Sequence, residues 1–213
     1  EELLALYQSG RPLPSTMLGL SIQGEDVEDS GLVWEVGDID CRAYPLPGSL
    51  VRLPWRQMPT AAVQVSMHPT EGLPATPADP RQLLIRVIEQ LEAEGYYPVM
   101  ACELEFYLLD QKRDAEGRPQ PALDADGGRP RQTQVYGLRE LEQIEPFLRD
   151  LYAACKAQGI PARTAISEYA PGQVEITLEH GPVLAAMDQA VRYKRLVKGV
   201  AHRHGMQACF MAK

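Results

Sequence analysis

The chain has 213 residues, enough to bury the core of one domain or of two modest ones. Its formal net charge of -8 opposes a phosphate backbone, so nucleic acid is disfavoured as a partner. No apolar stretch reaches the length of a membrane span, and no signal-like segment opens the sequence, so we expect no membrane partner. Four widely spaced cysteines favour free thiols in a reducing compartment and predict a cytoplasmic protein.

Short apolar runs separated by turn residues fill the first third of the chain and predict a small β-rich unit. The runs span Thr16–Ile22, Leu32–Val36, Cys41–Tyr44, Ser49–Leu53 and Ala61–Met67. The next segment, His68–Pro80, carries four prolines and one glycine in thirteen residues. That composition is typical of a boundary between domains.

Beyond this boundary the apolar spacing becomes helical, and Asp79 stands where a helix N-cap is expected. Pro146 suits the first turn of a second helix. Three helices are predicted, over 80–94, 145–158 and 182–204, each ended by a glycine, namely Gly95, Gly159 and Gly205.

Strands are expected between these helices, at 98–109, 162–168 and 173–179, and after the last helix, at 206–212, with a tight turn at Tyr169–Gly172. The segment Asp110–Thr133 is rich in Gly, Pro, Asp and Arg and shows no periodicity, so it predicts a long mobile or functional loop. The mixture of helices and strands indicates an α+β fold for the whole chain.

Two pairs of glutamates occupy positions where strand patterning leads us to expect apolar residues. Glu103 and Glu105 are two residues apart in a predicted strand and therefore face the same side. Glu168 and Glu175 flank the tight turn, which brings two more carboxylates to neighbouring strands. Carboxylates gathered in this way need a cation, and oxygen ligands select Mg²⁺ or Mn²⁺. The alternative is the solvated face of an ordinary amphipathic sheet.

Several motifs, taken together in order and spacing, resemble the glutamine synthetase family over nearly the whole chain. The motifs are Glu103–Leu108, Ser167–Ile176, Val200–Gly205, Phe210–Lys213 and, near the start, Pro47–Leu50 with Leu53–Trp55. The resemblance is greatest to the γ-glutamylputrescine synthetase-like branch. It implies a β-grasp-like N-terminal domain over 1–74, then the first part of a catalytic domain, with an antiparallel sheet and helices, over 75–213.

The resemblance also implies a role for each glutamate. Glu103 would bind the metal ion nearer ATP, and Glu105 the ion nearer the glutamate substrate. Glu168 and Glu175 would complete the protein ligands of that second ion, which is Mg²⁺ or Mn²⁺. Lys213 falls in the family's Phe-Met-x-Lys-Pro segment.

The implied reaction joins the γ-carboxylate of glutamate to an amine through a γ-glutamyl phosphate, with ATP as co-substrate and a polyamine such as putrescine favoured. In the family, further site residues lie beyond the position of Lys213, so we expect a fragment that is inactive alone and a dodecamer-type ring for the longer protein. Ammonia as the amine, a non-catalytic metal-binding or structural relative, and a free-standing binding module remain alternatives.

Other polar residues are weaker candidates. Asp38 and Asp40 lie in the part that reaches the neighbouring subunit's site in the family, although acidic residues are common in turns. His202 and His204 stand at a predicted helix C-terminus, where a cation is favoured by the helix dipole. His68 and His180 are expected to be exposed.

Overall fold

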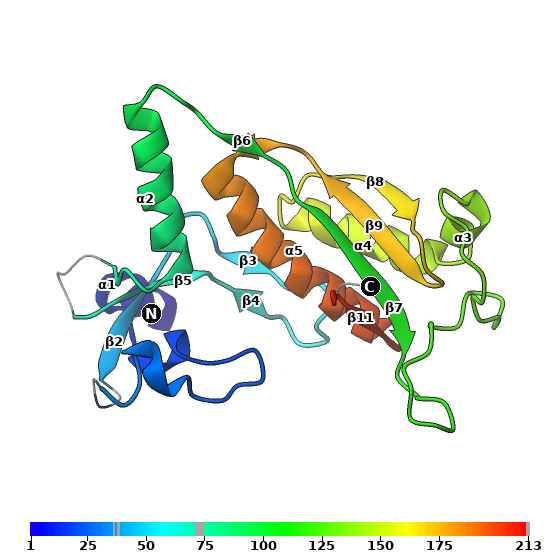
Figure 1. Cartoon of the computed structure of the whole chain (residues 1–213), viewed down its shortest axis with the longest axis horizontal. Helices are drawn as coiled ribbons and strands as arrows, with labels where there is room; N and C mark the ends of the chain where they lie inside the picture. Colours follow the sequence, from blue (N-terminus) through cyan, green and yellow to red (C-terminus); the bar gives the residue numbers. More distant parts are fainter. Residues whose placement is uncertain (36, 38, 71–74, 212–213) are drawn as a thin grey trace. The chain divides into compact units, whose positions relative to one another are not determined.

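The computed structural model describes residues 1–35, 37, 39–70 and 75–211, and it divides the chain into two compact units (Figure 1). The first unit consists of 1–51 and 61–97, and the second of 52–60 and 98–213. The expected division after residue 74 falls on residues outside the described part, as does Asp38. That domain boundary therefore stays a prediction.

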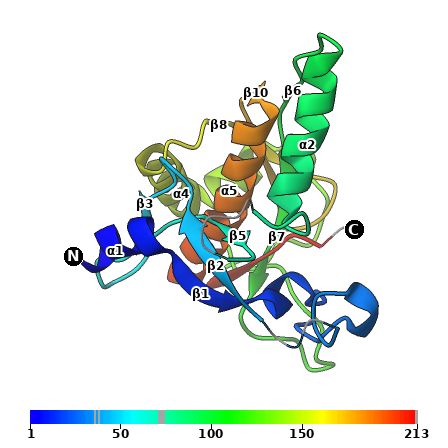
Figure 2. The same ribbon diagram turned by 90° about the vertical axis from the view of Figure 1, so that its left-hand side faces the viewer.

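The first unit is built on a three-stranded antiparallel sheet in the order β1-β2-β5, which can be followed in Figure 2, where the left-hand side of Figure 1 faces the viewer. Its strands are β1 (Arg11–Pro14), β2 (Asp40–Pro45) and β5 (Val65–His68). Alternate residues of β2 are buried, and Cys41, Ala43 and Met67 form a small core. The same unit contains α1 (Glu2–Ser9), η1 (Ser15–Leu18), η2 (Glu28–Ser30), β4 (Ala61–Ala62) and the helix described below, and β3 (Val51–Arg52) begins at its last residue before the break at 52.

The β-rich prediction is confirmed for the runs that contain Cys41, Val51 and Ala61, whereas the described residues of the first two runs form no strand beyond an isolated bridge between Leu20 and Asp26. Residues 16–22 form a 3-10 turn followed by bends, because the Ser15 hydroxyl donates to the Leu32 carbonyl (3.2 Å) and the Gly19 amide to the Thr16 carbonyl (2.8 Å). Such local bonds compete with strand pairing. Helix α1 and strand β1 were not predicted.

The helix expected after the proline-rich segment is confirmed as α2 (Pro80–Ala93), with Asp79 as its N-cap. The Asp79 carboxylate accepts hydrogen bonds from the Arg81 amide (2.9 Å) and from the Ser66 hydroxyl (2.9 Å). It is only 7% exposed. One carboxylate therefore both starts α2 and holds it to strand β5.

The second unit contains a four-stranded antiparallel sheet in the order β11-β7-β9-β8. The strands are β7 (Glu103–Asp110), β8 (Ala162–Ser167), β9 (Gln173–Leu178) and β11 (Met206–Cys209). The predicted strand 98–109 is interrupted, because its first residues form β6 (Val99–Met100), which pairs with β10 (Gly181–Pro182). The helices are α3 (Leu138–Glu142), which was not predicted, α4 (Glu145–Ala157) and α5 (Val183–Arg203).

One face of this sheet is covered by α4 and α5 (Figure 1). Phe106 and Ile176 from the strands pack with Phe147 of α4 and with Tyr193 and Leu196 of α5, all of them almost fully buried. Positions that alternate with these residues point to the opposite face. The sheet therefore has an apolar face under the helices and a second face of different character.

Replacing Asp79 by alanine should destabilise the first unit by about 1–2 kcal/mol, because α2 loses its cap and the buried Ser66 hydroxyl loses an acceptor. Urea denaturation followed by far-UV circular dichroism measures this loss. Glu89→Ala, at an exposed position of the same helix, is the matched control. Equal stability of the two variants would contradict the capping role.

Candidate metal centre

The strand register brings the predicted glutamates to one face of the second unit's sheet. Glu105 on β7 lies directly opposite Glu175 on β9, and Glu103 lies opposite Thr177. Directly opposite residues of an antiparallel pair share a face, and so do residues two apart on one strand. Glu103, Glu105 and Glu175 therefore lie on the face that points away from α4 and α5.

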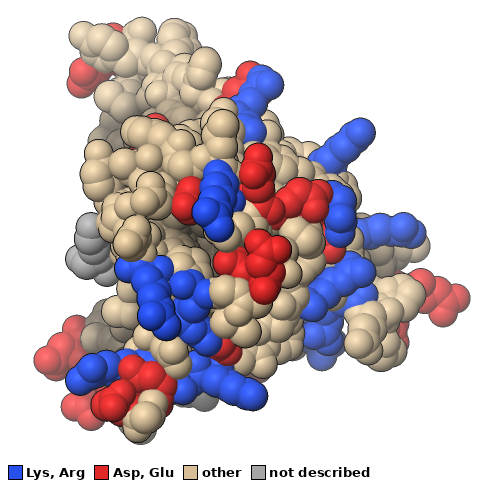
Figure 3. Space-filling model, turned by 90° about the vertical axis from the view of Figure 1, so that its right-hand side faces the viewer, with Lys and Arg blue, Asp and Glu red and all other residues tan. Residues whose placement is uncertain are grey.

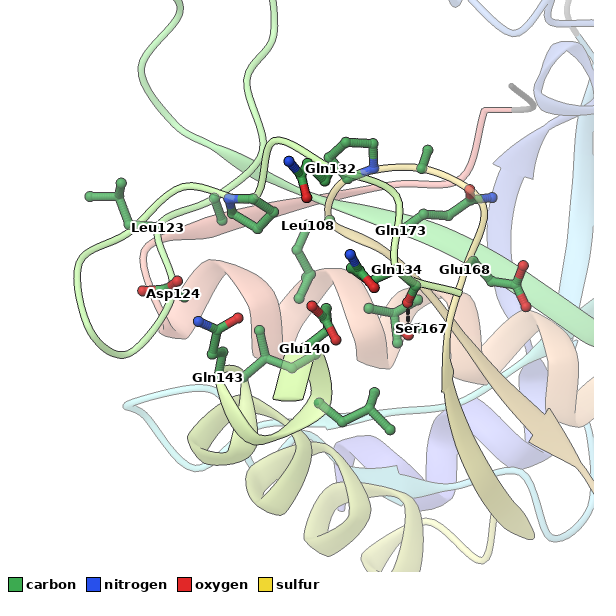
Figure 4. A pocket seen from close by; sticks show the side chains of 18 residues that line it. Leu108, Leu123, Asp124, Gln132, Gln134, Glu140, Gln143, Ser167, Glu168 and Gln173 are labelled. Carbon is green, nitrogen blue, oxygen red and sulfur yellow. Dashed lines mark hydrogen bonds between the residues drawn. The ribbon is translucent and has the colours of Figure 1, made fainter. Parts of the chain in front are cut away.

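Glu168 joins this group through the turn between β8 and β9. Its amide donates to the Gln173 carbonyl (3.0 Å), so it stands opposite Gln173, next to the pair formed by Ile166 and Glu175. Figure 4 shows the side chains of Glu168 and Gln173 directed away from that of Ser167, which points to the helix side of the sheet. The predicted turn at 169–172 and the two strands beside it are thus confirmed.

Gly172 fixes how closely this turn packs. Its φ is +75°, and an added Cβ would meet the Leu108 carbonyl oxygen at 3.1 Å and Pro121 Cβ at 3.2 Å. The Gly172 carbonyl accepts from the Leu108 amide (2.8 Å), and the Leu108 carbonyl accepts from the Ala122 amide (2.8 Å). Only glycine suits both the backbone conformation and the close approach.

Glu175 is the buried member of the four glutamates, since its side chain is only 8% exposed. Burial is the largest cause that raises its pKa, followed by the negative charges of Glu103, Glu168 and Glu105 and by a hydrogen bond with Glu168. Among the described residues, none of these four carboxylates forms an ion pair with a basic side chain. The protein thus leaves a concentrated negative charge unneutralised.

Gln173 adds a further acceptor to this face. Its side-chain amide nitrogen donates to the Glu105 carboxylate, while its Oε1 atom is buried without a hydrogen-bond partner. An orphaned buried oxygen beside unpaired carboxylates is a donor set that fits a hard divalent cation. The residues present therefore fit the Mg²⁺ or Mn²⁺ that the sequence predicts.

The four side chains are neighbours without forming a closed cage. In the part of the chain that the structure describes, no three His, Cys, Asp or Glu side chains converge closely enough to chelate an ion. Glu103 and Glu105 are exposed, so rotation of their side chains can close the arrangement without moving a strand. The assignment of the four glutamates as metal ligands remains a prediction.

The other predicted polar residues lie elsewhere. Asp40 is the exposed first residue of β2, paired with Pro14, and a functional role for it remains a prediction. His204 bonds to Asp150 of α4, with 3.0 Å between Nε2 and Oδ2. Burial raises the pKa of Asp150, but the hydrogen bonds and charges of His204 and Arg149 together outweigh it and lower that pKa overall. His180 and His202 are exposed, as expected for His180, whereas His68 is half-buried against the Tyr44 ring.

Two residues of the site were not assigned from the sequence. Gln173 is two residues from Glu175, so strand periodicity could have placed it on the same face. Tyr136 adopts a positive φ of 58°, a backbone conformation that glycine adopts more readily, and the next residue is a glycine. No pattern in the sequence predicts that the tyrosine, and not the glycine, takes this conformation. The Tyr136 amide donates to the Ser167 carbonyl (2.9 Å) and the Gly137 amide to the Ser167 hydroxyl (2.8 Å), which places the strained residue beside Glu168.

Residues 77–213 match the family model described as glutamine synthetase, catalytic domain. γ-Glutamylputrescine synthetase PuuA of Escherichia coli K12 is 39% identical over 99% of this chain, which covers 45% of that protein. Glutamate–isopropylamine ligase of a Pseudomonas species is 30% identical over 94% of this chain and is covered over 44% of its length. The chain thus spans less than half the length of these curated relatives.

Solved structures show the same fold. A structure described as a novel glutamine synthase homolog has a TM-score of 0.80 at 25% identity, covering 97% of this chain and 45% of that one. A complex of GmaS with ADP has a TM-score of 0.75 at 23% identity, covering 99% and 44%. The α+β fold predicted from the sequence is therefore confirmed. Among the described residues, no helix is long and apolar enough to cross a membrane.

Replacing Gly172 by alanine should destabilise the second unit by about 1–3 kcal/mol, since it adds left-handed strain and a collision with the Leu108 carbonyl. Gly205→Ala is the control, because Gly205 has a φ of +72° and no neighbour within 4 Å of the added Cβ. The difference in the free energy of unfolding between these variants isolates the contact. If Gly172→Ala and Gly205→Ala lower the free energy of unfolding equally, the close packing of Gly172 against the Leu108 carbonyl does not restrict the residue at position 172.

Glu175→Gln should stabilise the metal-free protein at neutral pH. A carboxyl whose folded-state pKa is raised contributes stability below its ordinary pKa and loses it as the pH rises through the raised value. The stability difference between Glu175→Gln and the unaltered protein should therefore grow from acid to neutral pH in urea denaturation with EDTA. Glu179→Gln, which removes an exposed carboxylate paired with Arg163, should show no such gain. A pH-independent difference would contradict this account.

Proposed function

Because the chain belongs to the glutamine synthetase family, we propose that it is part of an ATP-dependent ligase that joins the γ-carboxylate of glutamate to an amine. The four carboxylates on the open face of the sheet are the observation that supports this proposal most directly. Their negative charge, which no basic side chain among the described residues neutralises, would be balanced by a divalent cation. The activity, substrates and partners are proposed for a longer protein that contains this chain.

The reaction brings two anions together, because a carboxylate oxygen of glutamate attacks the γ-phosphorus of ATP as ADP leaves. A divalent ion bound at this site would supply the positive charge that neutralises the reacting oxygens. In our proposal Glu105, Glu168 and Glu175 hold one ion on the side of the glutamate substrate, and Glu103 contributes to a second ion on the side of ATP. Gln173 fixes the orientation of the Glu105 carboxylate through its side-chain amide.

In the second step the neutral amine nitrogen attacks the acyl carbon of γ-glutamyl phosphate, the bond from that carbon to the phosphate oxygen breaks, and the nitrogen passes a proton to a general base, which leaves the amide and free phosphate. Water must be kept from the acyl phosphate during this step. Tyr136, Tyr169 and Leu138 are exposed apolar side chains that border the end of the sheet where Glu168 lies. We propose that this border shields the intermediate and receives the carbon chain of an alkyl amine.

The favoured amine is a polyamine such as putrescine. This choice is supported by the 39% identity to a γ-glutamylputrescine synthetase over nearly the whole chain. Ammonia remains the second candidate, because a glutamine synthetase of Methanosarcina mazei is 31% identical over 78% of the chain. A ring of identical subunits, with the N-terminal unit at a neighbour's site, is proposed from the family.

Acidic and basic side chains lie beside each other on the face drawn in Figure 3, which looks at the right-hand side of Figure 1. A nucleic-acid phosphate backbone binds to an extended basic surface more strongly than to a surface of mixed charge. The mixed charges are compatible with small anionic and cationic substrates. They do not favour nucleic acid as a partner.

In the longer protein, putrescine should stimulate glutamate-dependent release of phosphate from ATP more strongly than ammonium at equal concentration of the neutral amine. Glu105→Gln should lower kcat roughly a hundredfold or more, since it removes a ligand of the ion that would neutralise the reacting oxygens. A coupled phosphate assay measures both effects. Equal or greater stimulation by ammonium would favour glutamine formation, and full activity of Glu105→Gln would contradict the proposed site.

The 213-residue chain alone should release no phosphate above background under the same conditions, because it carries ligands for one ion and only one ligand for the other. Amide formation by the purified chain, with mass spectrometry of the product, would refute that expectation.

A further inference from the structure

A small pocket lies where helices α4 and α5 meet the segment 52–60 of the second unit. Its apolar floor contains Ala154 of α4 and Val200 of α5, which are 3% and 2% exposed. The volume of about 130 Å³ has room for several water molecules or for one small ligand. None of the described residues that line it belongs to a strand, so the pocket is separate from the carboxylate face of the sheet.

Trp55 forms one wall of this pocket and lies against helix α5. Gly199 of α5 leaves the space for it, because a Cβ added at that position would overlap the indole ring. The segment that carries Trp55 is also tied to the end of α4, where the Gln158 side-chain amide donates to the Arg52 carbonyl (2.6 Å). The pocket therefore has a preformed aromatic wall on which a hydrocarbon group can pack.

Arg203 and Asp150 bring opposite charges to the same pocket. Among the described residues Arg203 forms no ion pair, and its Nη1 atom donates only a long hydrogen bond, of 3.4 Å, to the Pro54 carbonyl. The Asp150 carboxylate contacts His204 (3.0 Å) and Arg149 (3.4 Å). A carboxylate has about four acceptor sites, so Asp150 keeps capacity for a further donor.

This pair of side chains discriminates between ligands by their charge. A simple anion would be attracted by Arg203 but repelled by Asp150, and a simple cation would meet the reverse. A ligand that carries both charges can bind to both side chains and brings no net charge into the pocket.

We propose that the pocket binds a small zwitterion, such as an aliphatic amino acid, with its carboxylate on Arg203, its ammonium group on Asp150 and its hydrocarbon group against Trp55. The proposal goes beyond the ligase function and does not rest on it. None of the four glutamates of the metal centre lines this pocket, and binding needs no ATP or metal ion.

Trp55 supplies the signal for the test. The chain has two tryptophans, and the other, Trp34, is 69% exposed. In the Trp34→Phe variant of the 213-residue chain, kept in EDTA, L-valine should change the Trp55 fluorescence and saturate with a Kd roughly in the millimolar range. Isovalerate, which lacks the ammonium group, and isobutylammonium, which lacks the carboxylate, should each bind about fivefold or more weakly.

Variants made in the same background identify the contacts. Arg203→Gln should weaken L-valine binding about fivefold or more and abolish the preference for L-valine over isobutylammonium, because only the carboxylate contact is lost. Arg195→Gln removes an exposed charge of the same helix outside the pocket, and it should bind L-valine as before. Gly199→Ala should displace the indole ring and weaken binding, although alanine itself favours the helix.

Three results would overturn the proposal. They are the absence of a saturable change in Trp55 fluorescence, equal L-valine affinity of Arg203→Gln and Arg195→Gln, and equal binding of L-valine, isovalerate and isobutylammonium. Circular dichroism checks that each variant is folded. Because the ligase activity is measured separately on the longer protein with ATP, failure of either proposal leaves the other testable.

Discussion

The burial of Glu175 in the central strand pair is the constraint on which the proposed chemistry depends. A carboxylate that is 8% exposed and faces three other carboxylates has a raised pKa, so its ionised form costs free energy unless a cation is bound. The strand order imposes this cost, because β7 and β8 both pair with β9 and so bring the four carboxylates together. A sheet with the same strands in another order would disperse the four charges.

The rest of the second unit supports that arrangement. Helices α4 and α5 bury the apolar face of the sheet, so the register that places Glu105 opposite Glu175 cannot slip by one residue without exposing Phe106 and Ile176. Gly172 lets the turn pack against β7 and Pro121, which sets the position of Glu168. Stability is thus supplied on one side of the sheet, and the charged face on the other side is free to serve a ligand.

Strand periodicity and turn residues were sufficient to predict most of the second unit and the shared face of Glu103 and Glu105. The N-cap at Asp79 and the helix end before Gly159 could also be predicted from the sequence, because each depends on a few neighbouring residues. The burial of Glu175 could not be predicted from the sequence, since it depends on which strands flank β9. The turn at 16–22 was missed because it depends on Ser15 reaching a carbonyl seventeen residues away. The left-handed Tyr136 depends on Ser167, which is likewise distant in sequence.

The central claim is that Glu105, Glu168 and Glu175 share one divalent ion and that Glu103 lies outside its coordination sphere. Anomalous diffraction from crystals of the chain soaked in Mn²⁺ tests this claim most directly. The account predicts one peak about 2.0–2.3 Å from carboxylate oxygens of those three residues. A peak bound by other residues, or no peak at this face at saturating Mn²⁺, would contradict it.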